Sequence, residues 1–187
     1  MGKAMKTEKG RRAIGAVKIT VIVVCLATVI ISATFFAVRS ILKAEFPMKY
    51  QDKISLYAET YGVPEDLLYG VIHTESGYDE KAKSHAGAIG LTQITPETFL
   101  WLQTKTGENL PEEALYDADT SVKYRAVFYG LLLKEFGGDE KTAIAAYHAG
   151  RGQVNAWLRD PDISTEGKTL VNIPEKKKKK YVEKVQR

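Results

Sequence analysis

Residues 64–76 read PEDLLYGVIHTES, and this stretch decides both the fold class and the candidate chemistry of the chain. Pro64 predicts the start of a helix, because proline is tolerated best at the first helical position. At about 100° per residue, Glu75 lies within about 20° of Leu68 around the helix axis, with Val71 beside them. Glu75 is therefore predicted to be centred on the face that enters the core. A charged group is seldom buried there without a partner or a purpose, and the simpler alternative is that Glu75 turns out to solvent at the helix end.

Helical signals continue through most of residues 50–187. Apolar side chains recur at spacings of three and four, and glycine, proline or a capping side chain marks the segment ends. The predicted helices are one that ends before Gly62, one from Pro64, one from Pro96 with Thr95 as its cap, one over 122–136, one from Asp139 to Tyr147, a short one at 154–158 and a last one over 181–185. Alternating runs typical of strands are nearly absent. We therefore predict an all-α fold for a domain of about 135 residues, which is large enough to bury a core unaided.

Residues 86–96 read AGAIGLTQITP and predict a loop that faces Glu75. Two glycines and several small side chains let a backbone approach a ligand closely, and Gln93 offers both a donor and an acceptor. Such a loop is suited to line a sugar-binding cleft opposite Glu75. Because glycine-rich loops are common, the loop alone does not establish a function.

Three motifs together resemble the soluble lytic transglycosylase domain, which has a lysozyme-like fold. Their order and spacing agree with that family over roughly residues 50–185. Each motif alone would be weak, whereas three in register are specific. The motifs are Glu75-Ser76, Gly87-Ala88-x-Gly90-Leu91-x-Gln93-Ile94-x-Pro96 and Ala146-Tyr147-x-Ala149-Gly150.

The resemblance implies an enzyme that cleaves peptidoglycan glycan strands at the β-1,4 bond between N-acetylmuramic acid and N-acetylglucosamine. By the family pattern Glu75 is the single acid/base, and the muramic acid's own 6-hydroxyl closes onto C1 to leave a 1,6-anhydro end. One evident carboxylate suits this chemistry, because ordinary glycosidases need two. Two alternatives stay open: a goose-type lysozyme, in which Asp79 or Glu80 positions water, and a non-catalytic cell-wall-binding module.

The same match assigns substrate-binding roles to residues around Glu75. These residues are Ser76, Gly90, Gln93, Tyr147, His148 and Tyr181. The structural alternatives are a helix cap for Ser76, a loop-bracing amide for Gln93 and a packed aromatic ring for Tyr147.

Two positions depart from the family pattern. His148 stands where the family usually has asparagine; both side chains form hydrogen bonds, but histidine can also become charged near neutral pH. A run of five lysines at 176–180 precedes Tyr181, where the family commonly has a Glu-Thr-Arg segment. The run is most simply a solvated face, and the alternative is a site for anionic wall polymer or peptide-stem carboxylates. No His-Glu-x-x-His arrangement predicts a metal, and no cofactor is expected.

The N-terminal part predicts a membrane anchor. Residues 19–38 carry no charged side chain, and a helix of that length spans roughly 30 Å, the thickness of a bilayer's hydrocarbon core. Residues 1–18 hold six Lys or Arg against one acid, which favours a cytoplasmic N-terminus. We therefore predict a basic cytoplasmic tail over 1–18, an uncleaved transmembrane signal-anchor helix over 19–40, a linker over 41–49 and an extracytoplasmic domain over 50–187, at the plasma membrane. A cleaved signal peptide is the alternative.

The charge distribution argues against a nucleic-acid partner. The net charge is +4, yet residues 44–175 hold 12 Lys or Arg and 21 Asp or Glu, a balance of −9. No basic face is therefore spread across the domain. Cys25, the only cysteine, lies in the predicted anchor and cannot form an intramolecular disulfide. The expected partner is the peptidoglycan glycan strand, and the sequence leaves open a protein partner from the cell wall or a secretion machinery.

Overall fold

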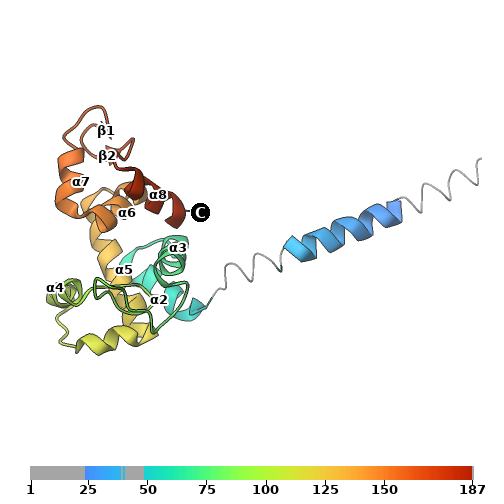
Figure 1. Cartoon of the computed structure of the whole chain (residues 1–187), viewed down its shortest axis with the longest axis horizontal. Helices are drawn as coiled ribbons and strands as arrows, with labels where there is room; N and C mark the ends of the chain where they lie inside the picture. Colours follow the sequence, from blue (N-terminus) through green and yellow to red (C-terminus); the bar gives the residue numbers. More distant parts are fainter. Residues whose placement is uncertain (1–23, 39, 41–48, 187) are drawn as a thin grey trace, which may run out of the picture. The chain divides into compact units, whose positions relative to one another are not determined.

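The computed structural model describes residues 24–38, 40 and 49–186 (Figure 1). The chain divides after residue 47 into two units. In the first unit, residues 24–38 are helical and their side chains are exposed. Within the described ranges, no helix is both long enough and apolar enough to cross a membrane.

Much of the predicted N-terminal organisation lies outside the described residues. This applies to the basic tail over 1–18, to the start of the predicted anchor at 19–23 and to the linker at 41–48. The length and topology of the anchor therefore stay predictions.

The second unit is mainly helical, as predicted, and the long helix α5 runs through it (Figure 1). Its helices are α2 (Gln51–Tyr61), α3 (Glu65–Ser76), α4 (Pro96–Thr106), the 3-10 helix η1 (Glu112–Tyr116), α5 (Ala118–Glu135), α6 (Glu140–Ala149), α7 (Arg151–Trp157) and α8 (Lys176–Val185). A short antiparallel hairpin of β1 (Ser164–Thr165) and β2 (Thr169–Leu170) joins α7 to α8.

Local signals determine where several helices begin and end. The Thr95 side chain accepts a hydrogen bond of 3.3 Å from the backbone N–H of Thr98 at the start of α4. Asp139 accepts one of 2.8 Å from the backbone N–H of Thr142 at the start of α6. Gly62 ends α2 in the left-handed conformation. Because these caps satisfy backbone groups that lack a partner within the helix, they define its ends, and the predicted caps are confirmed.

Three details of the C-terminal part differ from the prediction. The short helix expected at 154–158 is α7, which already begins at Arg151. The all-α expectation did not include the hairpin, because strands of two residues are too short to show an alternating pattern. The last helix was expected over 181–185, but α8 already begins at Lys176. Lysine is a good helix former and no breaker follows Glu175, so the helix includes the lysine run. The five lysines form the first half of α8, and all except the half-buried Lys178 are exposed.

Two clusters of buried side chains share α5. The first cluster packs α2, α3, α6 and α8 around it. The second packs α4, η1 and the loop before α4 on another side of α5, and consists of Ile89, Ile94, Phe99, Leu102, Leu115, Tyr124 and Val127. Since both clusters are built on one helix, α5 fixes the loop before α4 relative to α6.

The close packing of α8 on α3 depends on Gly70. A Cβ atom at Gly70 would collide with the backbone carbonyl of Val185, in the last turn of α8. Val182 and Val185 are buried in the first cluster. This approach brings Tyr181 beside Glu75, which is 106 residues away in the sequence.

Candidate active site

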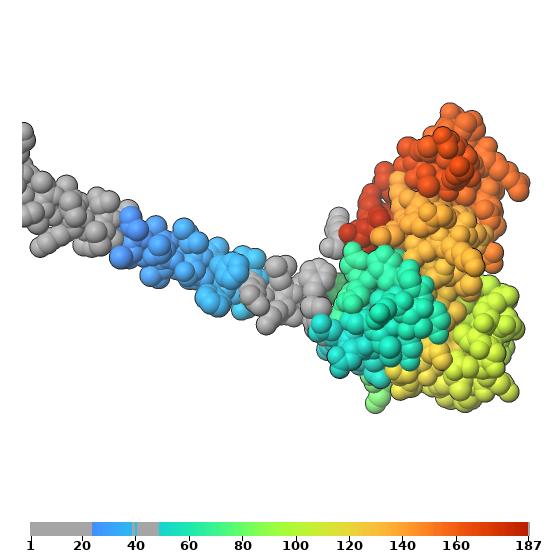
Figure 2. Space-filling model, turned by 180° about the vertical axis from the view of Figure 1, so that it is seen from behind, coloured from blue at the N-terminus to red at the C-terminus, as the bar shows by residue number. Residues whose placement is uncertain are grey.

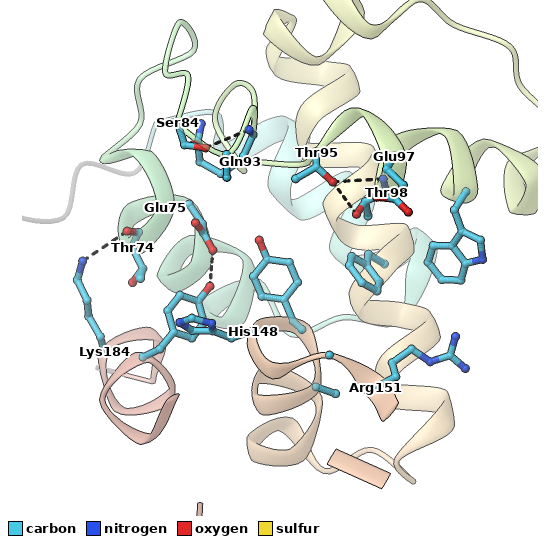
Figure 3. A pocket seen from close by; sticks show the side chains of 18 residues that line it. Thr74, Glu75, Ser84, Gln93, Thr95, Glu97, Thr98, His148, Arg151 and Lys184 are labelled. Carbon is cyan, nitrogen blue, oxygen red and sulfur yellow. Dashed lines mark hydrogen bonds between the residues drawn. The ribbon is translucent and has the colours of Figure 1, made fainter. Parts of the chain in front are cut away.

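A cleft of about 990 Å³ opens within the helical domain. One wall comes from α3, α4 and the loop between them, and the other comes mainly from α6, α7 and α8. Figure 2 shows the surfaces of these two regions in teal to lime and in orange to red. Thr74 and Lys184 lie at one end of the cleft, and Glu97 and Arg151 lie toward the other (Figure 3).

Glu75 lies on the cleft wall, in the last turn of α3 (Figure 3). Leu68, Val71 and Ile72 on the same helix face are fully buried, whereas Glu75 is half-buried. The apolar face of α3 therefore runs from the core to the cleft, and Glu75 stands where the face emerges. The predicted helix face is correct, but the carboxylate reaches the cleft rather than the core, because α3 ends at this edge.

Two carboxylates line the cleft in the described part of the chain, Glu75 and Glu97. Glu97 belongs to the first turn of α4, and its side chain lies well apart from Glu75 in Figure 3. Asp79 and Glu80, the candidates for positioning water, are not among the cleft-lining residues. Asp79 instead accepts a hydrogen bond of 2.9 Å from the backbone N–H of Lys81. The described residues therefore give Glu75 no adjacent carboxylate for a two-carboxylate mechanism.

Tyr181 of α8 contacts Glu75 directly. Its hydroxyl donates a hydrogen bond of 2.5 Å to Glu75 Oε1. Burial raises the pKa of Tyr181 far above its ordinary value, and the neighbouring Tyr129 and Glu75 add to this effect. The hydroxyl therefore keeps its proton at neutral pH and can donate it in a hydrogen bond to the carboxylate.

Tyr147 of α6 lines the cleft beside Tyr181, with 6.1 Å between the ring centroids. Its hydroxyl oxygen accepts a hydrogen bond of 2.9 Å from Arg125 Nη2. Burial raises the pKa of Tyr147, and Arg125 opposes part of that rise. Because the oxygen is occupied as an acceptor, the hydroxyl proton is directed away from Arg125.

His148 also belongs to the cleft lining. Its ring packs edge-on against Tyr181, with 4.1 Å between the ring centroids. His148, which stands where the family pattern has asparagine, thus contacts Tyr181, the tyrosine whose hydroxyl donates to Glu75. No group of three or more His, Cys, Asp or Glu side chains in the described residues is arranged to hold a metal ion.

The loop between α3 and α4 presents Gln93 to the cleft. Gln93 adopts a φ of 51°, and its amide nitrogen donates to the carbonyls of Ala82 at 3.1 Å and Gly90 at 3.0 Å. These bonds fix the side chain. No described residue donates to its amide oxygen, which therefore offers an acceptor to a ligand.

Ser76 and Gly90 support this loop and are not among the cleft-lining residues described. Ser76 Oγ donates a hydrogen bond of 2.7 Å to the carbonyl of Leu91. Gly90 has a φ of 74°, and a Cβ atom there would collide with the carbonyl of Leu115, so the position favours glycine. The structure thus places Gln93, Tyr147, His148 and Tyr181 in one cleft with Glu75, and Ser76 and Gly90 behind its wall.

Three side chains of this region were not predicted from the sequence. Arg125 is buried behind Tyr147, and Trp101 and Phe128 form an edge-to-face pair in the cleft wall, with 5.6 Å between the ring centroids. Arg125 lies four residues before Tyr129 on α5, so helical periodicity places it on an apolar stripe. The pattern that identified Glu75, a charged residue on an apolar helix face, was therefore also present at Arg125.

Known proteins resemble this chain in sequence. Residues 52–169 match the family model described as the transglycosylase SLT domain. The soluble lytic murein transglycosylase of Escherichia coli (strain K12) is 28% identical over 148 residues, which are 77% of this chain and 23% of the relative. The membrane-bound lytic murein transglycosylase C of Haemophilus influenzae (strain PittEE) is 30% identical over 127 residues, which are 62% of this chain and 36% of the relative.

A solved structure agrees in fold as well as in sequence. The X-ray structure of an inactive mutant of the lytic transglycosylase Slt from Pseudomonas aeruginosa matches with a TM-score of 0.68 at 28% identity, over 77% of this chain and 24% of that chain. The match thus spans about a quarter of the length of the Escherichia coli and Pseudomonas aeruginosa proteins. Since the family model covers well over half of the chain, this protein belongs to the transglycosylase SLT domain family.

Proposed function

We propose that this protein is a peptidoglycan lytic transglycosylase with Glu75 as its single acid/base. It cleaves the β-1,4 bond between N-acetylmuramic acid and N-acetylglucosamine and leaves 1,6-anhydromuramic ends. The observation that carries the proposal is a carboxylate on the cleft wall that accepts a hydrogen bond from Tyr181 and has no adjacent carboxylate among the described residues. The names of the relatives, which are lytic murein transglycosylases, support the same reaction.

In the first step, protonated Glu75 donates its proton to the glycosidic oxygen while the bond from that oxygen to C1 breaks. Negative charge then forms on the Glu75 carboxylate. The hydroxyl of Tyr181 already points at this carboxylate, so its hydrogen bond strengthens as the charge develops.

In the second step, the Glu75 carboxylate removes the proton from the 6-hydroxyl of the muramic acid. The hydroxyl oxygen bonds to C1, which closes the anhydro ring, and Glu75 regains its proton. No water is consumed. The attacking group is part of the substrate, and such intramolecular reactions gain strongly from proximity.

The other cleft residues are proposed to hold the glycan strand. Gln93 offers its amide oxygen to a sugar hydroxyl or N–H group, and Tyr147 and His148 face the strand from the opposite wall. Ser76 and Gly90 contribute by holding the loop that carries Gln93.

The test is mass spectrometry of the products that the full chain releases from purified peptidoglycan, with Glu75→Gln as the comparison. Anhydromuramic ends from the native chain alone support the proposal. Reducing ends would assign a goose-type lysozyme, which uses water. Release from neither chain would assign a non-catalytic cell-wall-binding module.

We also propose that residues 19–40 anchor the domain at the outer face of the plasma membrane, with residues 1–18 in the cytoplasm. The uncharged run at 19–38 and the basic residues before it support this topology, as does a relative that is named membrane-bound. The chain is then expected to resist alkaline carbonate extraction and to be digested by protease added outside the cell. A shortened, soluble chain in the medium would instead demonstrate a cleaved signal peptide.

A further inference from the structure

Arg125 is a fully buried cation in the middle of α5. In the part of the chain that the structure describes, no ion pair joins it to a carboxylate. Its Nε and Nη1 also have no hydrogen-bond partner there. Burying a charge without an opposite charge is unfavourable, so the buried position of Arg125 needs an explanation.

Arg125 binds Tyr147 in two ways. Its Nη2 donates a hydrogen bond of 2.9 Å to the hydroxyl, and its guanidinium carbon lies 4.1 Å from the centroid of the ring, within the range of a cation–π interaction. Nη2 also donates to the backbone carbonyl of Thr92, the residue before Gln93 in the cleft loop. Arg125 therefore links α6 to that loop from inside and determines where Tyr147 stands in the cleft wall.

The contacts of Arg125 lead to Glu75 through two tyrosines. Tyr147 packs beside Tyr181, with 6.1 Å between the ring centroids, and the hydroxyl of Tyr181 donates a hydrogen bond to Glu75. Burial works to lower the pKa of Arg125, but its surroundings, Tyr147 first among them, raise it, so the guanidinium keeps its charge beside Tyr147.

We propose that Arg125 is a positioning residue, which holds Tyr147 in the cleft wall beside Tyr181 and Glu75 while the glycan strand reacts. This inference rests on the proposed function. Arg125 is not among the described residues that line the cleft, so it acts through Tyr147.

The experiment replaces Arg125 in the full chain, solubilised in detergent, by Met, Gln or Lys. Release of anhydromuramic ends from peptidoglycan is measured as kcat and KM. Methionine approaches arginine in length, and an apolar side chain in place of a buried charge is compatible with folding. Circular dichroism and the melting transition report whether each variant folds.

The expected result follows from the contact with Tyr147. In Arg125→Met the kcat falls by about 100-fold with little change in KM, because Tyr147 loses its position. Arg125→Lys keeps the positive charge beside Tyr147 and recovers part of kcat.

A folded Arg125→Met or Arg125→Gln chain with native kcat would overturn the proposal. Failure of both neutral variants to fold, with Arg125→Lys folded, would also overturn it, because the charge would then serve the fold alone. The native chain is assayed first. If it releases no anhydromuramic ends, the proposed function is rejected, and this inference with it.

Discussion

The last turn of α3 and the middle of α5 each place a charged side chain on an apolar helix face, in contrasting surroundings. Glu75 is half-buried, opens to the cleft and accepts a hydrogen bond from Tyr181. Arg125 is fully buried and reaches the cleft only through Tyr147 among the residues described. We infer from this contrast that a charge on an apolar face marks a site and that the end of the face decides the role of the charge. In the proposed function, the face that opens to the cleft presents Glu75 to substrate, and the closed face makes Arg125 act through Tyr147.

The largest effect is expected for Glu75, the charged side chain on the helix face that opens to the cleft. Glu75→Gln keeps the shape of the side chain but removes the acid, so release of anhydromuramic ends should fall by about 1,000-fold. Melting should change little, because the amide oxygen still accepts from Tyr181. The matched control is Glu97→Gln, the other cleft carboxylate in the described residues, which should stay close to native activity. An equal loss in both variants would show that two carboxylates act.

The sequence predicted the position of Glu75 on the open face of α3 but did not predict that Arg125 lies on the closed face of α5. Glu75 was found because its position relative to Leu68 and Val71 follows from helix geometry alone. Arg125 has the same periodicity within α5, but an arginine in a long helix is usually on a solvated face, and the contacts that bury it come from Thr92 and Tyr147, far away in the sequence.

Other parts of the site depend on contacts between distant residues. Ser76 reaches the carbonyl of Leu91, and the position of Gly90 is determined by a carbonyl of η1. Neither contact follows from local propensity. The helix caps at Thr95 and Asp139 involve near neighbours, and these were predicted correctly.

The next effect concerns the hydroxyl that connects α8 to Glu75. Tyr181→Phe removes the hydrogen bond of 2.5 Å but keeps the ring, so kcat should fall by about 100-fold with little change in KM. Tyr116→Phe, in η1 and away from the cleft, is the control. A change in KM with native kcat would show that Tyr181 binds substrate and does not act on Glu75.

A smaller effect tests the packing that brings Tyr181 to this place. Gly70→Ala introduces a Cβ atom against the carbonyl of Val185, which should destabilise the fold by about 2 kcal/mol and lower activity as α8 shifts. Gly152→Ala in α7 is the control, since a Cβ there meets no atom within 4 Å. Thermal melting and activity are measured together. Native stability and activity in Gly70→Ala would contradict the described docking of α8 on α3.

The smallest effect is expected at an ion pair away from the cleft. Glu108 bonds to Lys123 at 2.7 Å and to the hydroxyl of Tyr124 at 2.8 Å, and these bonds lower its pKa. A carboxylate whose pKa is lower in the folded state than in the unfolded state stabilises the fold at pH values above its unfolded pKa. This stability is lost as the pH falls through the folded pKa. Because the pair is partly exposed, Glu108→Gln should lose less than about 1 kcal/mol at neutral pH.

The pH dependence of stability distinguishes the loss of this ion pair from a loss of packing. Denaturant midpoints of the native chain and Glu108→Gln should differ at neutral pH and converge in acid, where native Glu108 is protonated. A difference of the same size at both pH values would assign the loss to packing and not to charge.

The central claim is that Glu75 delivers no water to the glycan, and one measurement tests it directly. Peptidoglycan is digested by the native chain in water enriched in heavy oxygen, and the masses of the new muramic acid ends are recorded. We predict ends that are lighter than reducing ends by one water molecule and carry no heavy oxygen. Reducing ends that contain heavy oxygen would contradict the claim and show that the cleft hydrolyses the bond.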